Sequence, residues 1–202
     1  MDLIDKLIKE GWLKTPRIIE AFKKIKRVDF LPDYMKEMAG QDQALPIGYG
    51  QTNSQPAVVA FMLEKLQPKP GEKILDIGSG SGWTTALLAE IVGEKGKVFS
   101  IEVIPELKEF GENNVSSYNL KNTEHLCING FQGYKKEAPF DRILVSASAK
   151  EILRAWKDQL KIRGKIVCPV GSSIWVLEKI NKNEFFKEEN PGFVFVPLVD
   201  KK

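Results

Sequence analysis

Apolar residues follow two different spacings along this chain. Over residues 1 to about 40 they recur at helical intervals, which predicts short amphipathic helices. From residue 73 onward, short apolar runs alternate with segments of helical spacing. We expect strands at 73–77, 97–103, 125–128, 141–147 and 164–170, and helices at 57–67, 82–92, 105–118 and 151–160. Such alternation predicts a parallel sheet with helices on both faces.

After Gly171 the pattern changes to short apolar runs joined by short links. IWVLEKI, EFFKE and FVFVPL each have strand character, and the polar sequence at 181–183 favours a hairpin. The sheet should therefore end in antiparallel strands. The predicted fold class is α/β: a Rossmann-like, doubly wound, mostly parallel sheet with antiparallel C-terminal strands and a small N-terminal helical subdomain.

Residues 41–56, which we call the substrate loop, interrupt all periodicity with glycines and prolines. A long segment without secondary structure inside a small protein is often functional. A length of 202 residues predicts one principal domain. We expect a helical region with the substrate loop over 1–56 and a larger domain over 57–202, packed as one unit.

Composition narrows the class of protein only slightly. The chain is 43% hydrophobic and 28% charged, which is ordinary for a globular protein. No apolar run approaches the roughly 20 residues of a membrane span, and the first residues lack the apolar core of a signal peptide. We therefore expect a cytoplasmic protein without a membrane partner, and a monomer by default.

The net charge of +3 is not diagnostic, although FKKIKR at 22–27 concentrates basic residues. This stretch fits an amphipathic helix with Ile18, Ile19, Phe22 and Ile25 inward, so a solvated face is favoured over a nucleic-acid contact. Cys127 and Cys168 both lie in apolar segments and are expected to be reduced, buried thiols. With one histidine and no CxxC, we expect no metal site.

The most informative stretch is ILDIGSGSG, residues 74–82, in which an apolar strand ends at Asp76 and runs into three closely spaced glycines. Helix formers follow immediately, so a strand, a glycine turn and a helix N-terminus should form a cofactor pocket. The spacing is GxGxG, whereas a dinucleotide fingerprint is GxGxxG. A second strand ends near Glu102, whose carboxylate can accept hydrogen bonds from both ribose hydroxyls.

An acidic residue before GxGxG, followed by an acidic strand end, resembles the class I S-adenosylmethionine (AdoMet)-dependent methyltransferases. The resemblance implies AdoMet as cofactor and S-adenosylhomocysteine as its product. The residues that it assigns to cofactor binding are Asp76, Gly78, Ser79, Gly80, Gly82, Glu102, Asn129 and Gly130. A structural role for Asp76 is an equally good interpretation.

ALPIGYGQTNSQP in the substrate loop resembles the signature of protein-L-isoaspartate O-methyltransferases. The resemblance extends through PRIIEAFKKIKRVDFLP, VFSIEVIPEL, APFDRILVSASA, QLKIRGKIVCPVG and the closing FVFVPL. It implies methyl transfer from AdoMet to the free carboxylate of isoaspartyl residues in peptides and proteins, which begins their repair. By the same resemblance, Ser54 and Thr52 hold that carboxylate, with Ser54 the stronger candidate.

One triplet departs from the family pattern. The family commonly has GDG before the fourth strand, and here Ile128, Asn129 and Gly130 take those positions. Asn129 can still accept a hydrogen bond from adenine through its amide oxygen, without charge assistance. We therefore expect weaker AdoMet binding. Ser146 and Ser148 follow the fourth strand and are weaker candidates for lining the substrate cleft.

Three alternatives stay open on sequence alone. A methyltransferase acting on RNA would explain the basic stretch but would leave GQTNSQP without a role. A second possibility is an enzyme that methylates aspartate in one dedicated peptide partner. A third is a non-catalytic AdoMet-binding protein, which only the altered triplet at Asn129 supports.

Overall fold

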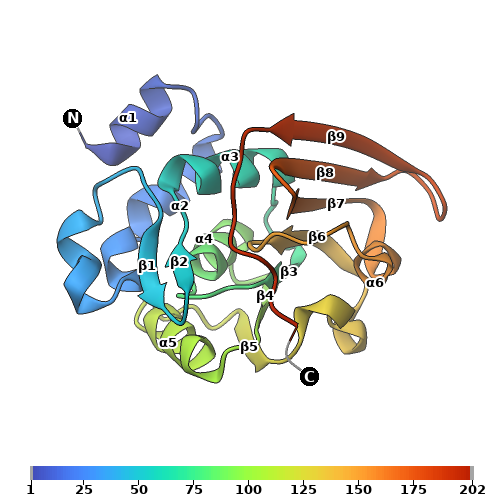
Figure 1. Ribbon diagram of the computed structural model, residues 1–202. Coiled ribbons are helices and arrows are strands. Elements are labelled where there is room, and N and C mark those ends of the chain that lie inside the picture. Colours follow the sequence, from blue (N-terminus) through green and yellow to red (C-terminus); the bar gives the residue numbers. More distant parts are fainter. Residues whose placement is uncertain (1, 201–202) are drawn as a thin grey trace.

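A computed structural model describes residues 2–200 and shows a seven-stranded sheet at the centre of the molecule (Figure 1). The strand order is β5-β4-β3-β6-β7-β8-β9, parallel from β5 through β7 and antiparallel for the last two pairings. The strands are β3 (Lys73–Ile77), β4 (Lys97–Glu102), β5 (Thr123–Cys127), β6 (Phe140–Val145), β7 (Leu160–Val170), β8 (Ser173–Lys179) and β9 (Phe185–Pro191). The predicted fold class is confirmed.

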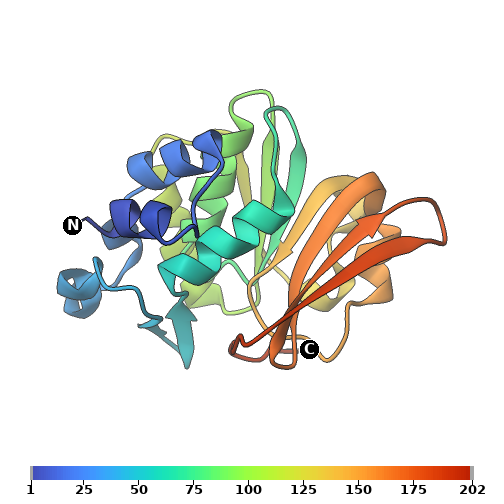
Figure 2. The same cartoon turned by 90° about the horizontal axis from the view of Figure 1, so that it is seen from above.

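Helices cover both faces of this sheet, and Figure 2 shows the N-terminal ones gathered at one side of the molecule. The α-helices are α1 (Leu3–Lys9), α2 (Pro16–Lys24), α3 (Pro56–Leu66), α4 (Trp83–Val92), α5 (Pro105–Ser116) and α6 (Arg154–Asp158). Short 3₁₀ turns are η1 (Arg27–Phe30), η2 (Asp33–Met38), η3 (Gly130–Gln132) and η4 (Lys135–Glu137). In the described chain, no helix has both the length and the apolar character that a membrane crossing requires.

Side chains that alternate along the strands enter two different cores. In β3, Ile74 packs with α2, α3 and α4, whereas Leu75 and Ile77 pack in the opposite core with Trp156 of α6. This period of two is the geometry of a strand that is buried on both faces. The N-terminal helices share the first core with α3 and α4, and the division of the chain at residue 56 stays a prediction.

The substrate loop contains secondary structure that periodicity did not predict. β1 (Leu45–Gly48) and β2 (Gln51–Asn53) pair as an antiparallel hairpin of their own. Tyr49 and Gly50, at φ 55° and 71°, make the turn between them. Leu45 and Ile47 are buried against Ile104 and Leu107 of the α5 region. The strands were missed because only two apolar residues alternate before the turn.

Several other sequence-based boundaries were wrong. FVFVPL forms no strand, because Gly192 at φ 97° turns the chain away from β9. The helix predicted at 151–160 spans only Arg154–Asp158, and the following strand begins at Leu160 instead of residue 164. Residues 193–199 instead run across the carboxyl end of the sheet, and we call them the C-terminal segment.

Two predictions about burial also need correction. Cys168 is buried as expected, but Cys127 is exposed because β5, which it ends, is an edge strand. The predicted inward positions Ile18, Phe22 and Ile25 are buried, whereas Ile19 is only partly so. Arg27 is not on a solvated face: helix α2 ends before it, and only 6% of this residue is exposed.

Candidate active site

The glycine loop that follows β3 turns sharply between two strands and two helices. Gly78, Gly80 and Gly82 have φ values of 76°, 51° and 85°, which favour glycine. A Cβ atom on Gly82 would lie 2.7 Å from the carbonyl oxygen of Gly111 in α5. The missing side chain therefore lets the N-terminus of α4 approach α5 closely. A larger residue at position 82 would clash with α5.

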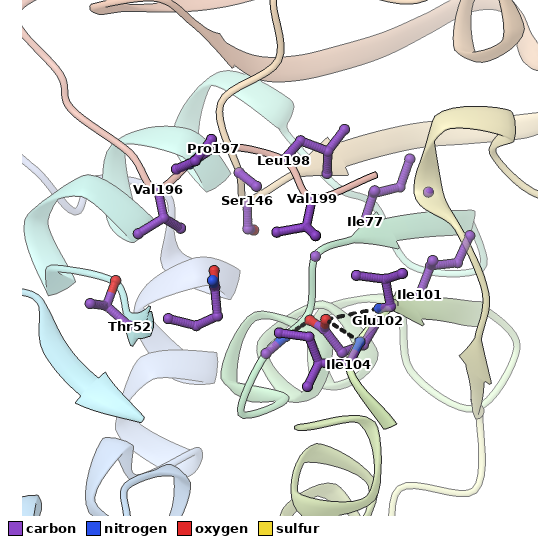
Figure 3. Close-up of a pocket in the computed structure, with 16 residues that line it drawn as sticks. Thr52, Ile77, Ile101, Glu102, Ile104, Ser146, Val196, Pro197, Leu198 and Val199 are labelled. Carbon is purple, nitrogen blue, oxygen red and sulfur yellow. Dashed lines mark hydrogen bonds between the residues drawn. The ribbon is translucent and has the colours of Figure 1, made fainter. Parts of the chain in front are cut away.

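Glu102 ends β4 and holds the glycine loop in place (Figure 3). Its Oε2 accepts a hydrogen bond from the Gly80 amide at 2.9 Å. Its Oε1 accepts from the amides of Val103 and Ile104 at 2.8 and 3.0 Å. An ionised carboxylate has about four lone-pair sites, so Glu102 retains capacity for a ligand's hydroxyl groups.

Asp76 is buried directly beneath the glycine loop. Its Oδ2 accepts hydrogen bonds from the hydroxyls of Thr85 and Thr84 at 2.7 and 2.9 Å. Its Oδ1 is buried and has no partner among the described residues. Burial raises the pKa of Asp76 to about 6; the two threonine hydrogen bonds oppose this shift and the charge of Glu102 adds to it. Buried polar atoms are normally hydrogen-bonded, so this unpaired carboxylate oxygen, together with the raised pKa, makes Asp76 a candidate functional group.

A hollow of about 520 Å³, open to solvent, lies beside Glu102 and the glycine loop, and Asp76 is buried outside its lining (Figure 3). Gly78 and Gly80 line the hollow, and Val196 to Val199 of the C-terminal segment lie across it from Glu102. Backbone hydrogen bonds at 2.8 Å, from Ser148 to Val196 and from Leu198 to Ser148, fix that segment. The hollow also includes Gln51 and Thr52 of β2, so the substrate loop forms part of its wall.

Thr52 and Ser54 lie at the boundary between this hollow and an open groove. The groove, about 670 Å³ with its open side, is lined by Thr52, Ser54, Gln55, Val58, Ser146 and residues 194–196. A narrow depression connects Thr52 and Ser54 with Gly78, Gly80 and Ser146. The Oγ of Ser146 is buried without a partner in the described chain. The structure thus brings together the hydroxyls singled out from the sequence, and Ser148 instead anchors the C-terminal segment.

The model of the protein-L-isoaspartate(D-aspartate) O-methyltransferase family matches residues 1–202 of this chain. The chain belongs to this family. A protein-L-isoaspartate O-methyltransferase of Methanopyrus kandleri is 39% identical over 99% of this chain and 91% of its own. Another, of Pyrococcus horikoshii, is 43% identical over 97% of this chain and 90% of its own.

Solved structures agree with the fold. A protein-L-isoaspartate O-methyltransferase structure is 27% identical, with a TM-score of 0.90 over 98% of this chain and 65% of its own. A putative Plasmodium falciparum enzyme of the same name, in complex with S-adenosyl-L-homocysteine, has a TM-score of 0.88 over 98% of this chain and 96% of its own. At 24% identity, that second structure supports the fold alone.

The triplet that departs from the family pattern is arranged differently from our expectation. Gly130 lines the hollow, and a Cβ atom there would lie 2.5 Å from Ile77. Asn129 is not among the lining residues: its Oδ1 accepts from the Phe131 amide at 2.9 Å and its Nδ2 donates to Asp200 Oδ1 at 2.6 Å. A contact between Asn129 and adenine therefore stays a prediction.

Three features in or near the candidate site were not singled out from the sequence. The C-terminal segment was read as a strand, and Asn53 was only one polar residue among several in the substrate loop. Arg27 was included in a basic stretch expected on a solvated helix face, whereas it begins η1 and is buried. Among residues 2–200, no three His, Cys, Asp or Glu side chains gather as metal ligands would.

Proposed function

We propose that this protein transfers a methyl group from AdoMet to the free carboxylate of isoaspartyl residues, which starts the repair of damaged proteins. One observation carries the proposal: Thr52 and Ser54 lie between the glycine-loop hollow and an open groove. A cofactor in the hollow and a peptide in the groove would meet at these hydroxyls. Membership of the isoaspartyl methyltransferase family supports the same reaction.

The residues of the hollow fit AdoMet. Glu102 would accept hydrogen bonds from ribose hydroxyls, and Asp76, buried beneath the glycine loop, has a free acceptor in Oδ1 although it does not line the hollow. Ile77, Ile101 and Ile104 provide apolar surface for an adenine ring, and Leu198 lies opposite. When bound, AdoMet supplies an electrophilic methyl group and leaves as S-adenosylhomocysteine.

The described residues that line the hollow and the groove include no histidine or lysine, and the substrate's own chemistry requires no strong base. A free α-carboxylate has a pKa of about 3.5, so it is already ionised and nucleophilic at neutral pH. Ser54 and Thr52 would donate to one carboxylate oxygen and direct the other toward the methyl group. Neutral hydroxyls suit this task better than a lysine or arginine, because a tight ion pair would reduce the nucleophilicity of the carboxylate.

The ester formed in this way activates the carbonyl for attack by the neighbouring backbone nitrogen, with loss of methanol. The resulting succinimide hydrolyses to a mixture of isoaspartate and normal aspartate, so repeated cycles give net repair. The open groove suits peptides of varied sequence, because its wall is formed by small polar residues and by Val58, Val194 and Phe195. Val194 is 91% exposed, so its apolar side chain is accessible to a bound peptide.

Methyl transfer from labelled AdoMet to a matched peptide pair tests the proposal. We expect base-labile label on the isoaspartyl peptide and none on the peptide with normal aspartate. Ser54→Ala should lower kcat/KM by about 10- to 100-fold, the effect of one hydrogen bond to a charged group. Ser117→Ala, on the exposed end of α5, is the matched control and should leave kcat/KM unchanged.

Other outcomes would point to the alternatives. Equal labelling of both peptides, or of neither while AdoMet binds, would contradict isoaspartyl specificity. The next substrates to test would then be RNA, with its salt-dependent binding, and extracts containing a dedicated peptide partner. Monomeric state, activity without a metal ion and a cytoplasmic location stay predictions, which sedimentation, chelator treatment and fractionation would test.

A further inference from the structure

Arg27 connects two separate stretches of the substrate loop. Its Nη1 donates to the Gln41 carbonyl at 2.8 Å and its Nη2 to the Gln43 carbonyl at 2.7 Å. Its Nε donates to Asn53 Oδ1 at 2.8 Å, and Nη2 also reaches the Ser54 carbonyl at 3.2 Å. One guanidinium group therefore holds the beginning of the loop and the residues beside the proposed carboxylate site.

The connection continues into the glycine loop. Asn53, which is buried, donates from Nδ2 to Ser81 Oγ at 3.0 Å. The Arg27 guanidinium also lies 5.6 Å from the ring centre of Trp83, the first residue of α4. Asn53 thus joins the substrate loop, and Arg27 with it, to the glycine loop. Arg27 also contacts the start of α4 through Trp83.

The chemistry of this contact requires arginine. Only 6% of Arg27 is exposed, and its partners are mainly neutral oxygens, with Asp42 acting from further away. Burial lowers the pKa of Arg27 to about 10, which still leaves the group charged at neutral pH. A lysine has three donors around one point and cannot reproduce the planar fork that reaches both ends of the loop.

Asp42 fixes the far side of the same loop. Its Oδ1 accepts from the Ala57 amide at 2.8 Å, at the N-terminus of α3. Its Oδ2 accepts from Gln55 Nε2 at 3.2 Å. Arg27 therefore holds the carbonyl of Ser54, and Asp42 holds the next side chain, Gln55. The α3 end of the loop is anchored without the guanidinium.

We propose that Arg27 is a positioning residue, which holds the substrate loop against the glycine loop and so places Ser54 and Thr52 for methyl transfer. This inference rests on the proposed function. Arg27 belongs to neither loop, yet the positions of the two hydroxyl donors depend on it. Arg27 lines neither the hollow nor the groove and is a positioning residue, not a catalytic one.

Arg27→Lys tests the proposal, with Arg142→Lys as its matched control. Arg142 is equally buried, at 6% exposure, but it pairs with Glu72 at the amino end of the sheet. We expect Arg27→Lys to lower kcat/KM for the isoaspartyl peptide by about ten-fold or more, while the Kd for AdoMet changes by less than about three-fold. Arg142→Lys should lower thermal stability and leave both constants near wild type.

Two results would overturn the proposal. One is an unchanged kcat/KM in Arg27→Lys. The other is an equal loss in both variants, which would make the effect one of general stability. Should Arg27→Lys fail to fold, Asn53→Ala takes its place, because it removes the acceptor of Arg27 Nε and the link to Ser81 while the Arg27 contacts with Gln41 and Gln43 are retained. We expect Asn53→Ala to lower kcat/KM by about ten-fold as well.

Hydrogen exchange separates this inference from the proposed function. We expect amides of residues 41–55 to exchange about ten-fold faster or more in Arg27→Lys than in wild type or Arg142→Lys, with β3 amides unchanged. This readout requires no methyl acceptor. Faster exchange without any isoaspartyl methylation would contradict the proposed function and support Arg27 as the anchor of the loop, whereas unchanged exchange would overturn the proposal about Arg27.

Discussion

The two ends of the sheet differ in whether their buried polar groups have hydrogen-bond partners. At the amino end, Asp141 accepts from the Lys73 amide and from Lys161 Nζ, both at 2.8 Å, and Arg142 pairs with Glu72 at 3.0 Å. At the carboxyl end, three buried side-chain atoms lack partners within residues 2–200. These atoms are Asp76 Oδ1, Trp83 Nε1 and Ser146 Oγ.

This contrast identifies the functional end better than size does. The hollow at the amino end, about 1240 Å³ with its open side, is larger than the one beside the glycine loop, about 520 Å³. Yet Asn122 in the larger hollow already donates to the carbonyls of Ala89 and Gly93. Buried polar groups are normally satisfied, so groups left unsatisfied beside a hollow indicate where a ligand supplies the missing partners.

The largest expected effect comes from removing Glu102. Glu102→Ala loses the acceptor for three backbone amides and for ribose, so AdoMet affinity should fall by about 1000-fold, or ~4 kcal/mol, in calorimetry. Glu72→Ala is the control at the other end. It should cost about 3 kcal/mol of folding stability and leave AdoMet affinity unchanged. Equal loss of affinity in both variants would remove the distinction between the two ends.

The second effect is a pH dependence that arises from Asp76. Burial raises the pKa of Asp76 from 3.8 to about 6, so the folded state disfavours its ionised form. The stability that this group contributes is therefore complete below pH 3.8 and is lost as pH rises through about 6. Relative to Asp76→Asn, the unfolding free energy of the ligand-free wild type should fall by roughly 3 kcal/mol between acid and neutral pH. A constant difference would contradict the burial of this charge.

The third effect is a release of protons from Asp76 when the cofactor binds. A donor placed on Asp76 Oδ1 would favour the ionised form, so binding near pH 6, where the carboxyl is about half protonated, should release up to roughly half a proton. Calorimetry in buffers of different ionisation enthalpy measures this number. Asp76→Asn should show no such release, and equal release in both proteins would place the proton elsewhere.

The smallest effect concerns the contact between Asn129 and Asp200. Exchanging the two groups, as Asn129→Asp with Asp200→Asn, keeps a hydrogen bond between them and returns a carboxylate to the triplet. Charge assistance should then strengthen AdoMet binding by about three-fold, or ~0.7 kcal/mol. Asp200→Asn alone is the control. Weaker binding in the exchanged variant would show that the amide is required where it stands.

Periodicity predicted the parts of the fold in which burial dominates. β3, β4 and α4 were placed to within a residue or so, because both faces of these strands and most of this helix are buried. The same reasoning located Asp76 and Glu102, since polar residues at the ends of buried strands lie at one edge of a sheet.

Parts that depend on contacts distant in sequence were not predictable in this way. The β1–β2 hairpin is held by packing on Ile104 and Leu107, which no local pattern shows. The C-terminal segment is placed by two backbone bonds with Ser148. The burial of Arg27 depends on carbonyl groups of the substrate loop, up to 27 positions away along the chain.

Crystals grown with S-adenosylhomocysteine provide the most direct test of the difference between the two ends. The account predicts ligand density in the hollow beside the glycine loop, with ribose hydroxyls on Glu102 and a donor within hydrogen-bond distance of Asp76 Oδ1. Density in the larger hollow near Lys97 and Asn122, or a ligand that leaves Glu102 without a contact, would contradict it.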